Sequence, residues 1–270
     1  MKTFRFNPPA FTVICLLLIA RSVFADVTQT QEFFQTILSE QDESRLPEPS
    51  DATRRLLDAS TLTPEEVRQV LPLAQRGVKS SMTTVRIHAL SLIFNVTFRP
   101  DSASLLEPYV DDIVPFLTDA DLAFRREAIV ILGQQNPGPS PKAKAALLAH
   151  LGDRDNTTRE TGMIAGALLV SSPSDRAVVR SVVNLARQRA DQNLSTDLIR
   201  AMGLTGVTTD EALGFIRYHF SDPAPDTRLT CVEAIGRMPK NVREGFAPEL
   251  TRLVANPDET QETRERPPLF

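Results

Sequence analysis

An aspartate stands six residues before an arginine at four places in this 270-residue chain. The four pairs are Asp119 and Arg125, Asp153 and Arg159, Asp222 and Arg228, and Asp258 and Arg264. A degenerate copy centred on Ser195 fills the one double interval, so the repeat period is about 35 residues. A period of that length is typical of helical hairpins stacked into a solenoid.

The residues that follow each arginine also repeat. With the arginine as position zero, positions +3, +4, +7 and +8 are apolar or small, which marks one face of an α-helix. The sets are Ala128, Ile129, Leu132, Gly133; Gly162, Met163, Gly166, Ala167; Leu198, Ile199, Met202, Gly203; Cys231, Val232, Ile235, Gly236; and, after Arg86, Ala89, Leu90, Ile93, Phe94. Another apolar helix precedes each set, as in LLEPYVDDIVPFL, so the repeating unit is a helical hairpin.

This pattern resembles the HEAT repeat family, including its phycobilisome-lyase-type short variant. The resemblance rests on the D-x5-R-x2-small core and on prolines in the first helices, at Asp119, Asp153, Asp222, Pro72, Pro115 and Pro248. It implies an all-α, right-handed α-solenoid with an armadillo-type superhelix. We expect about five hairpins and a truncated sixth within residues 61–270. The chain departs from the pattern at Ser80, at Arg189 and Ser195, and at Pro267.

Residues 1–25 are predicted to be a signal peptide. Lys2 and Arg5 precede an apolar run over residues 10–20, and SVFA ends just before Asp26. The run is too short to cross a bilayer, which takes about 20 residues, so a retained anchor is the weaker alternative. We therefore expect the mature chain to be periplasmic or secreted. Its net charge, −4 with the signal peptide included, makes nucleic acid an unlikely ligand.

Residues 26–60 are expected to form an N-terminal helical cap and a linker. Phe33, Phe34, Ile37 and Leu38 would share one face of a helix. This helix either covers the first hairpin or is a detachable amphipathic segment that docks on a partner. Burial of the two phenylalanines would favour the cap.

The sequence predicts no catalytic residues, no cofactor and no metal site, since the common catalytic motifs are missing. His150 and His219 occupy the same repeat position in hairpins two apart, which is too far for one metal ion. Cys231 is the one cysteine outside the signal peptide, so no intrachain disulfide is expected. It stands at a small stripe position and is interpreted as a core thiol.

The repeat arginines have two interpretations. They could form a ladder that binds acidic ligands, or each could tie hairpins together by reaching a loop aspartate that caps the second helix. The fixed spacing to the aspartate favours the structural role. At the C-terminal end, Phe246, Leu250, Leu253 and Val254 lie on a helix without a full partner, which predicts self-association or partner binding there.

The leading functional hypothesis is a non-catalytic scaffold for protein–protein interactions. The ligand would lie on the concave side, formed by the second helices, and we expect that side to be more positive than the convex one. The candidate contact residues are His88, Arg126, Val130, Gln134, Arg200 and Arg237. An extended acidic or mixed-charge peptide would suit them. The alternative is a lyase-like or enzyme-accessory role, which rests on analogy of fold alone.

Overall fold

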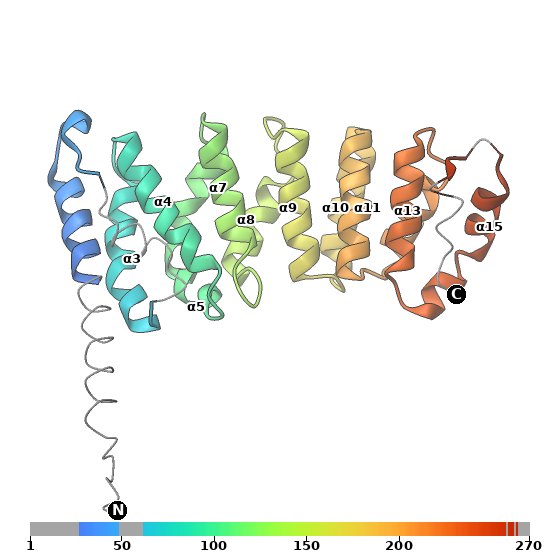
Figure 1. The fold of residues 1–270 in the computed structure, drawn as a ribbon, viewed down its shortest axis with the longest axis horizontal. Coiled ribbons are helices and arrows are strands. Elements are labelled where there is room, and N and C mark those ends of the chain that lie inside the picture. The colour runs from blue at the N-terminus through green and yellow to red at the C-terminus, as the bar shows by residue number, and fades with distance from the viewer. Residues whose placement is uncertain (1–26, 49–61, 258, 262, 264–270) are drawn as a thin grey trace, which may run out of the picture. The chain divides into compact units, whose positions relative to one another are not determined.

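The computed structural model describes residues 27–48, 62–257, 259–261 and 263. The predicted signal peptide, the pair Asp258 and Arg264, and Pro267 lie outside the described residues. Within those ranges the regular structure is helical, with no strand (Figure 1). No described helix is long and apolar enough to cross a membrane. The expected all-α solenoid of helical hairpins is confirmed.

The chain divides into two compact units, which are described separately. Unit 1 comprises residues 1–115 and 135–137, and unit 2 comprises residues 116–134 and 138–270. Unit 1 begins with a helix over residues 27–39. It continues with η1 (Glu43–Arg45), α3 (Pro64–Val78), α4 (Thr83–Thr97), α5 (Ser102–Leu106), η3 (Glu107–Tyr109) and α6 (Val110–Ile113).

The boundary between the units falls in the second expected hairpin, within η4 (Val114–Thr118). The helices of unit 2 are α7 (Leu122–Gly133), α8 (Pro141–His150), α9 (Thr158–Ser171), α10 (Arg176–Arg189), α11 (Gln192–Thr205), α12 (Asp210–His219), α13 (Pro225–Gly236), α14 (Lys240–Glu244) and α15 (Ala247–Ala255).

In unit 1, a capping box begins the first hairpin. The Thr63 hydroxyl accepts a hydrogen bond from the Glu66 amide, and the Glu66 carboxylate accepts one from the Thr63 amide at 2.7 Å. The helix over residues 27–39 buries Phe33, Phe34 and Ile37. The Phe33 ring lies edge-on to the His88 ring of α4, with 5.5 Å between centroids. These contacts favour the cap over a detachable helix.

In unit 2, the second helices of successive hairpins pack side by side, in the order α7, α9, α11, α13 (Figure 1). Small residues permit this close approach. A Cβ atom added to Gly133 would lie 2.6 Å from the Ala167 Cβ, and one added to Gly203 would lie 2.5 Å from the Ala234 Cα. Neighbouring backbones therefore meet where neither side chain is larger than a methyl group.

The predicted stripes are buried as expected on α7 and α11, and almost fully on α4 and α13, where Phe94 and Gly236, respectively, are partly exposed. On α9 the predicted stripe is wrong by two residues. The buried side chains are Ile164, Ala165, Leu168 and Leu169, in place of Gly162, Met163, Gly166 and Ala167. The cause is a longer loop before α9, which shifts the helix relative to Arg159.

The loop lengths are visible at the helix caps. Asp121 caps α7 two residues after Asp119, whereas Thr157 caps α9 four residues after Asp153. As a result Thr161 takes the helix position that Arg125 has in α7, the fourth after the cap.

At the C-terminal end, Phe246, Leu250 and Leu253 are buried, and Val254 alone of the four expected apolar residues is exposed, at 47%. This leaves little described apolar surface for self-association at that end.

Candidate functional site

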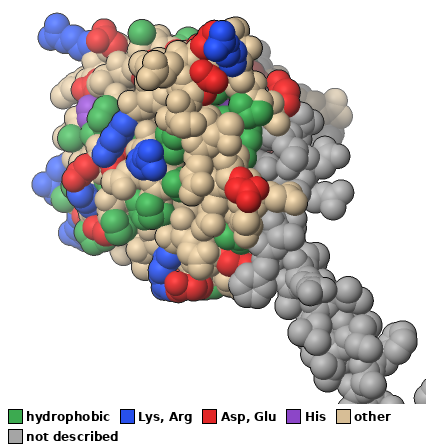
Figure 2. All heavy atoms as spheres, turned by 90° about the vertical axis from the view of Figure 1, so that its left-hand side faces the viewer, with side chains coloured by type: hydrophobic (Ala, Val, Ile, Leu, Met, Phe, Trp, Pro, Cys, Tyr) green, Lys and Arg blue, Asp and Glu red, His purple; other side chains and the backbone are tan. Residues whose placement is uncertain are grey.

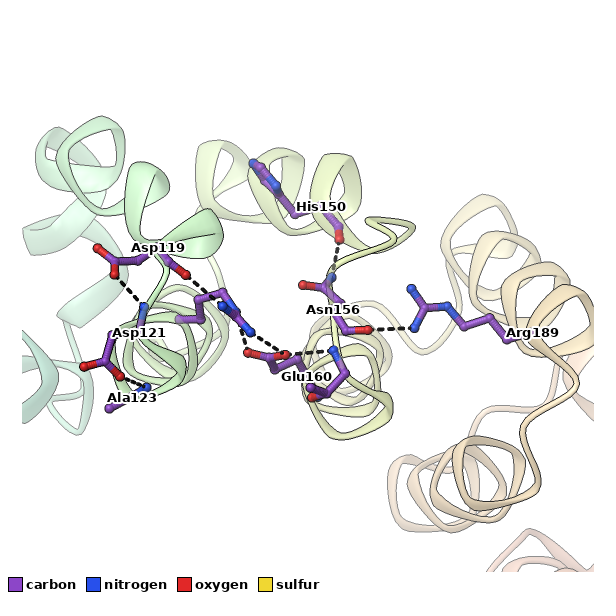
Figure 3. Close-up of polar contacts among 9 residues, drawn as sticks. Asp119, Asp121, Ala123, His150, Asn156, Glu160 and Arg189 are labelled. Atoms are coloured by element: carbon purple, nitrogen blue, oxygen red, sulfur yellow. Dashed lines mark hydrogen bonds and ion pairs between the residues drawn. The ribbon is translucent and has the colours of Figure 1, made fainter.

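The repeat arginine Arg125 joins two consecutive hairpins of unit 2. Its Nη1 donates to the main-chain carbonyl oxygen of Asp119 at 2.8 Å, and its Nε donates to Oε1 of Glu160 at 2.8 Å (Figure 3). Its Nη2 reaches Oε2 of the same carboxylate at 3.4 Å. The Glu160 side chain is fully buried and also completes the capping box of α9 with Thr157. We call this arrangement an arginine clamp.

Arg228 forms a second arginine clamp. Its Nη1 donates to the carbonyl oxygen of Asp222 at 2.7 Å, and its Nε and Nη2 donate to the two carboxylate oxygens of Glu259 at 2.7 and 3.0 Å. Glu259 is also buried. The planar guanidinium matches the carboxylate in both clamps, which is the geometry of a strong charge-assisted pair.

The clamps shift the ionisation of their members. Burial opposes ionisation of Glu160, but hydrogen bonds from Arg125 and Thr157 outweigh it and hold the pKa of Glu160 below its ordinary value. The hydrogen bonds to Glu160 and to Glu259 raise the pKa of Arg125 and Arg228, respectively. The clamp of Arg125 and Glu160 is therefore a charged pair at neutral pH.

The predicted pair of Asp153 and Arg159 does not form. Arg159 is exposed and makes no hydrogen bond or ion pair with any described residue. Arg189, at the end of α10, takes its place. It donates to the carbonyl oxygen of Asn156 at 3.2 Å (Figure 3), to that of Asp153 at 2.6 Å and to the Thr161 hydroxyl at 2.8 Å. In α7 and α13 the clamp arginine is the fourth residue after the helix cap, and we call this place the clamp position. The longer loop puts Arg159 two residues before the clamp position of α9, so an arginine of the next hairpin binds the same loop.

The aspartate side chains also differ from expectation. Asp119 accepts a hydrogen bond from the amide of Asp121 at 2.9 Å, and it is Asp121 that caps α7. Asp222 accepts one from the Ala224 amide in the same way. The carboxylates thus shape the loop, whereas the arginines bind the aspartate carbonyl oxygens.

Arg189→Ala is expected to lower the free energy of unfolding by about 1–3 kcal/mol, because it removes three hydrogen bonds that a charged group makes to the loop before α9 and to Thr161. Arg159→Ala is the matched control and should change it by less than about 0.5 kcal/mol. Urea unfolding followed by circular dichroism measures both. A larger loss for Arg159→Ala would contradict the observed register.

The histidines and the cysteine have local structural roles. Nδ1 of His150 lies 2.6 Å from Oδ2 of Asp153, and Nδ1 of His219 lies 2.9 Å from Oδ2 of Asp222. No group of three metal-ligating side chains gathers among the described residues. Cys231 is buried, burial raises the pKa of its thiol, and its Sγ donates to the carbonyl oxygen of Ile216 at 3.6 Å.

The six candidate contact residues are not equally accessible. His88 is partly buried beneath Phe33, and burial lowers its pKa. Val130 is also partly buried, whereas Gln134 and Arg237 are exposed. Arg126 is partly exposed, with a buried Nε that makes no hydrogen bond to a described residue. Arg200 is exposed and pairs with Asp197 at 2.9 Å.

Sequence reasoning missed two exposed apolar residues on the second helices. Val170 is 64% exposed and Leu204 is 65% exposed, although both are aliphatic. Each stands nine residues after the clamp position of its helix, Thr161 in α9 and Ser195 in α11. Gln134 and Arg237 take the same position in α7 and α13. Counting from Arg159 instead of Thr161 hid this correspondence.

We define the second-helix face as the side of α7, α9, α11 and α13 that points away from the buried stripes. Its members, by helical register, include Arg126, Glu127, Val130, Gln134, Gly162, Met163, Gly166, Val170, Asp197, Arg200, Leu204, Glu233 and Arg237. Three acidic and three basic residues stand among them. Figure 2 faces the left-hand side of Figure 1, which is the N-terminal part of unit 1, and there side chains of both signs lie among apolar ones.

Comparison with solved structures supports the fold. An engineered protein from the Northeast Structural Genomics Consortium is 14% identical, with a TM-score of 0.50, over 87% of this chain and 66% of that one, so this chain spans slightly less than two thirds of it. This chain therefore has the fold of an α-helical repeat protein. No protein-family model and no curated protein matches the chain, so the HEAT family remains a resemblance.

Designed armadillo repeat proteins align less closely. One is 15% identical over 86% of this chain and 94% of its own, with a TM-score of 0.41. Another, solved in complex with the peptide (KR)4, is 16% identical over the same shares, with a TM-score of 0.38.

Proposed function

We propose that the protein is a non-catalytic scaffold that binds an extended segment of a partner protein on the second-helix face. The observation that carries this proposal is the exposure of Val170 and Leu204 at equivalent positions of neighbouring helices. The two aliphatic side chains stand at the same position of adjacent helices, where one bound segment could contact both, and exposed apolar groups that recur on one face suit a partner-binding surface. A bound segment would cover both side chains.

Glycines next to these residues allow close approach. Gly162 and Gly166 stand on the face of α9, and a Cβ atom added to Gly166 would meet no atom within 4 Å. The α9 surface is therefore low at Gly162 and Gly166, between the longer side chains of α7 and α11. A peptide backbone fits such a surface at van der Waals distance, and Arg126 and Arg200 can then reach its side chains.

The charges of the face favour a mixed-charge ligand over a purely acidic one. Arg126, Arg200 and Arg237 are offset by Glu127, Asp197 and Glu233 on the same helices. Burial also raises the pKa of Glu127, which shows that this carboxylate lies partly within the face. Apolar contacts would provide most of the affinity. The arginines and the carboxylates of the face would fix the position of the bound segment.

Val170→Asp together with Leu204→Asp is expected to weaken partner binding at least about tenfold and to leave the melting temperature nearly unchanged, because both side chains are exposed. The partner would be recovered from a cell-envelope extract, identified by mass spectrometry and titrated against each variant. Val254→Asp, the same kind of change at an exposed residue of α15, is the matched control. Equal affinity of the double variant and the control would contradict the proposal.

Charge reversal tests the polar part of the same face. Arg126→Glu with Arg200→Glu should change both the affinity and its salt dependence, since exposed charges are screened within about 10 Å at 0.1 M salt. If neither changes, the two arginines do not contact the ligand.

We also propose that the scaffold acts outside the cytoplasm after loss of residues 1–25. The sequence of this segment supports the proposal. N-terminal sequencing of the protein from its source should begin at Asp26, and an intact Met1 in a membrane fraction would contradict it.

A further inference from the structure

Three places along unit 2 have an arginine between consecutive loops. Arg125 lies between α7 and α9, Arg189 between α9 and α11, and Arg228 between α13 and Glu259. Each donates to a loop carbonyl oxygen and to an acceptor of the neighbouring repeat. An arginine side chain is thus the regular occupant of the space between two loops.

The junction between α11 and α13 departs from this rule. The clamp position of α11 is Ser195, and the place that Arg189 holds in its loop, two residues before the helix cap, is taken by Asp222. Thr227 stands where Glu160 stands in α9, and its hydroxyl lies 3.0 Å from that of Thr196. Both sources of a clamp arginine are therefore missing from this junction.

A cleft of about 480 Å³ lies at this junction. It runs between the loop that joins α10 to α11 and the loop that joins α12 to α13, and its lining includes Asp191, Ser195, Phe215, Tyr218, His219 and Asp222. Ser195 is 5% exposed, and its hydroxyl makes no hydrogen bond to a described residue. Tyr218 is 74% exposed, although it is a large aromatic residue. The cleft therefore combines an aromatic wall with a serine hydroxyl that no described residue engages.

We propose that this cleft binds an arginine side chain of a partner protein, in the space where the chain's own arginines lie at the other junctions. The apolar and aromatic wall suits the alkyl stem and the flat face of a guanidinium, which stacks on aromatic rings. Ser195 provides an oxygen acceptor for its N–H groups. The carboxylates of Asp191 and Asp222 already accept hydrogen bonds within the chain, at the Leu194 and Ala224 amides, and they add negative charge to the cleft. A carboxylate ligand would instead be repelled by the negative charges of Asp191 and Asp222.

Arg187 also lines the cleft and is exposed. Its charge repels an incoming guanidinium and weakens the attraction of the two aspartates. The site therefore binds a single arginine weakly, and a partner protein would add contacts elsewhere. The cleft lies at the loops, whereas the second-helix face lies along the helices, so variants of one leave the other unchanged.

The test uses the fluorescence of Tyr218 in the full chain. The chain has no tryptophan and two tyrosines, so Tyr109→Phe leaves Tyr218 as the one fluorescent reporter. Titration with N-acetyl-arginine amide should change this fluorescence saturably, with a dissociation constant on the order of millimolar. N-acetyl-citrulline amide has nearly the same shape without the charge and should bind at least about tenfold more weakly. Equal responses to the two probes would overturn the proposal.

Ser195→Arg with Thr227→Glu rebuilds the clamp inside the chain. This variant should fill the cleft with its own arginine and lose the response to N-acetyl-arginine amide. A retained response in the folded variant would contradict the proposal. Arg187→Glu changes only an exposed residue and should tighten binding of the arginine probe at least about threefold, with little effect on the citrulline probe. Unchanged or weaker binding of the arginine probe would count against the site even if the rebuilt clamp failed to fold.

Discussion

Glu160→Ala is expected to lower the free energy of unfolding by about 3–5 kcal/mol, the usual cost of leaving one member of a buried ion pair without its partner. The substitution would leave the Arg125 guanidinium, whose side chain is 15% exposed, without its carboxylate, and would break the capping box with Thr157. Glu65→Ala is the control, because its pair with Arg68 is exposed, and it should cost at most about 1 kcal/mol. Chemical unfolding at pH 7 measures both.

A second variant separates the loss of a partner from the loss of packing. Arg125→Met with Glu160→Leu removes both charges and keeps apolar volume, so it should recover much of the stability that Glu160→Ala loses. If the double variant is as unstable as Glu160→Ala, the clamp is not the source of the effect.

The pKa of Glu160 predicts the pH dependence of the clamp. Because this pKa is lower in the folded than in the unfolded chain, the clamp stabilises fully above the unfolded value, about 4.3 for glutamate. Its contribution should be lost as the pH falls through the folded pKa. The stability difference between the wild type and Glu160→Ala should therefore shrink in acid.

Two glycine-to-alanine substitutions should have effects of opposite sign. Gly203→Ala is expected to destabilise by about 1–3 kcal/mol, because the new methyl group would lie 2.5 Å from the Ala234 Cα and 2.7 Å from its Cβ, and the contact is main chain. Gly166→Ala places the same methyl group where no atom lies within 4 Å, inside α9. It should stabilise by up to about 1 kcal/mol through helix propensity.

Thermal and urea unfolding of the two variants measure the difference directly. If the two substitutions change the free energy of unfolding equally, α11 and α13 do not approach as closely as the short distance between Gly203 and Ala234 indicates. A loss of partner binding in Gly166→Ala without a loss of stability would in turn locate the ligand on α9.

The period of the arginines predicts the hairpins and most of the buried stripes, since one helix face must be apolar wherever hairpins stack. It failed at α9, because spacing from an aspartate does not show how long a loop is. A local signal was present in the sequence: Thr157 and Glu160 form the T-x-x-E pattern of a capping box, which places the start of α9 two residues later than Arg159 suggests. With that start, Leu168 and Leu169 fall on the buried face.

The partners of the arginines were harder to predict. Glu160 and Glu259 are more than 30 residues beyond the arginines they bind, and no rule of helix spacing relates them. The cleft at Ser195 lies where a clamp arginine would otherwise bind an acceptor of the neighbouring repeat. Because the sequence did not show where the other arginines bind, the absence of an arginine at position 195 did not predict an open space. Exposure of Val170 could be predicted only once the register of α9 was known, whereas the correctly predicted stripe of α11 already excluded Leu204.

Site-directed crosslinking tests the central proposal, binding on the second-helix face, most directly. Cysteine would replace Val170, Leu204 or Val254 one at a time in a Cys15→Ser chain, each labelled with a benzophenone maleimide. Buried Cys231, whose thiol pKa is raised, should not react. After binding of the partner recovered from the envelope extract, irradiation should crosslink it to positions 170 and 204 and not to position 254. A crosslink at position 254 with none at 170 and 204 would contradict the proposed binding face.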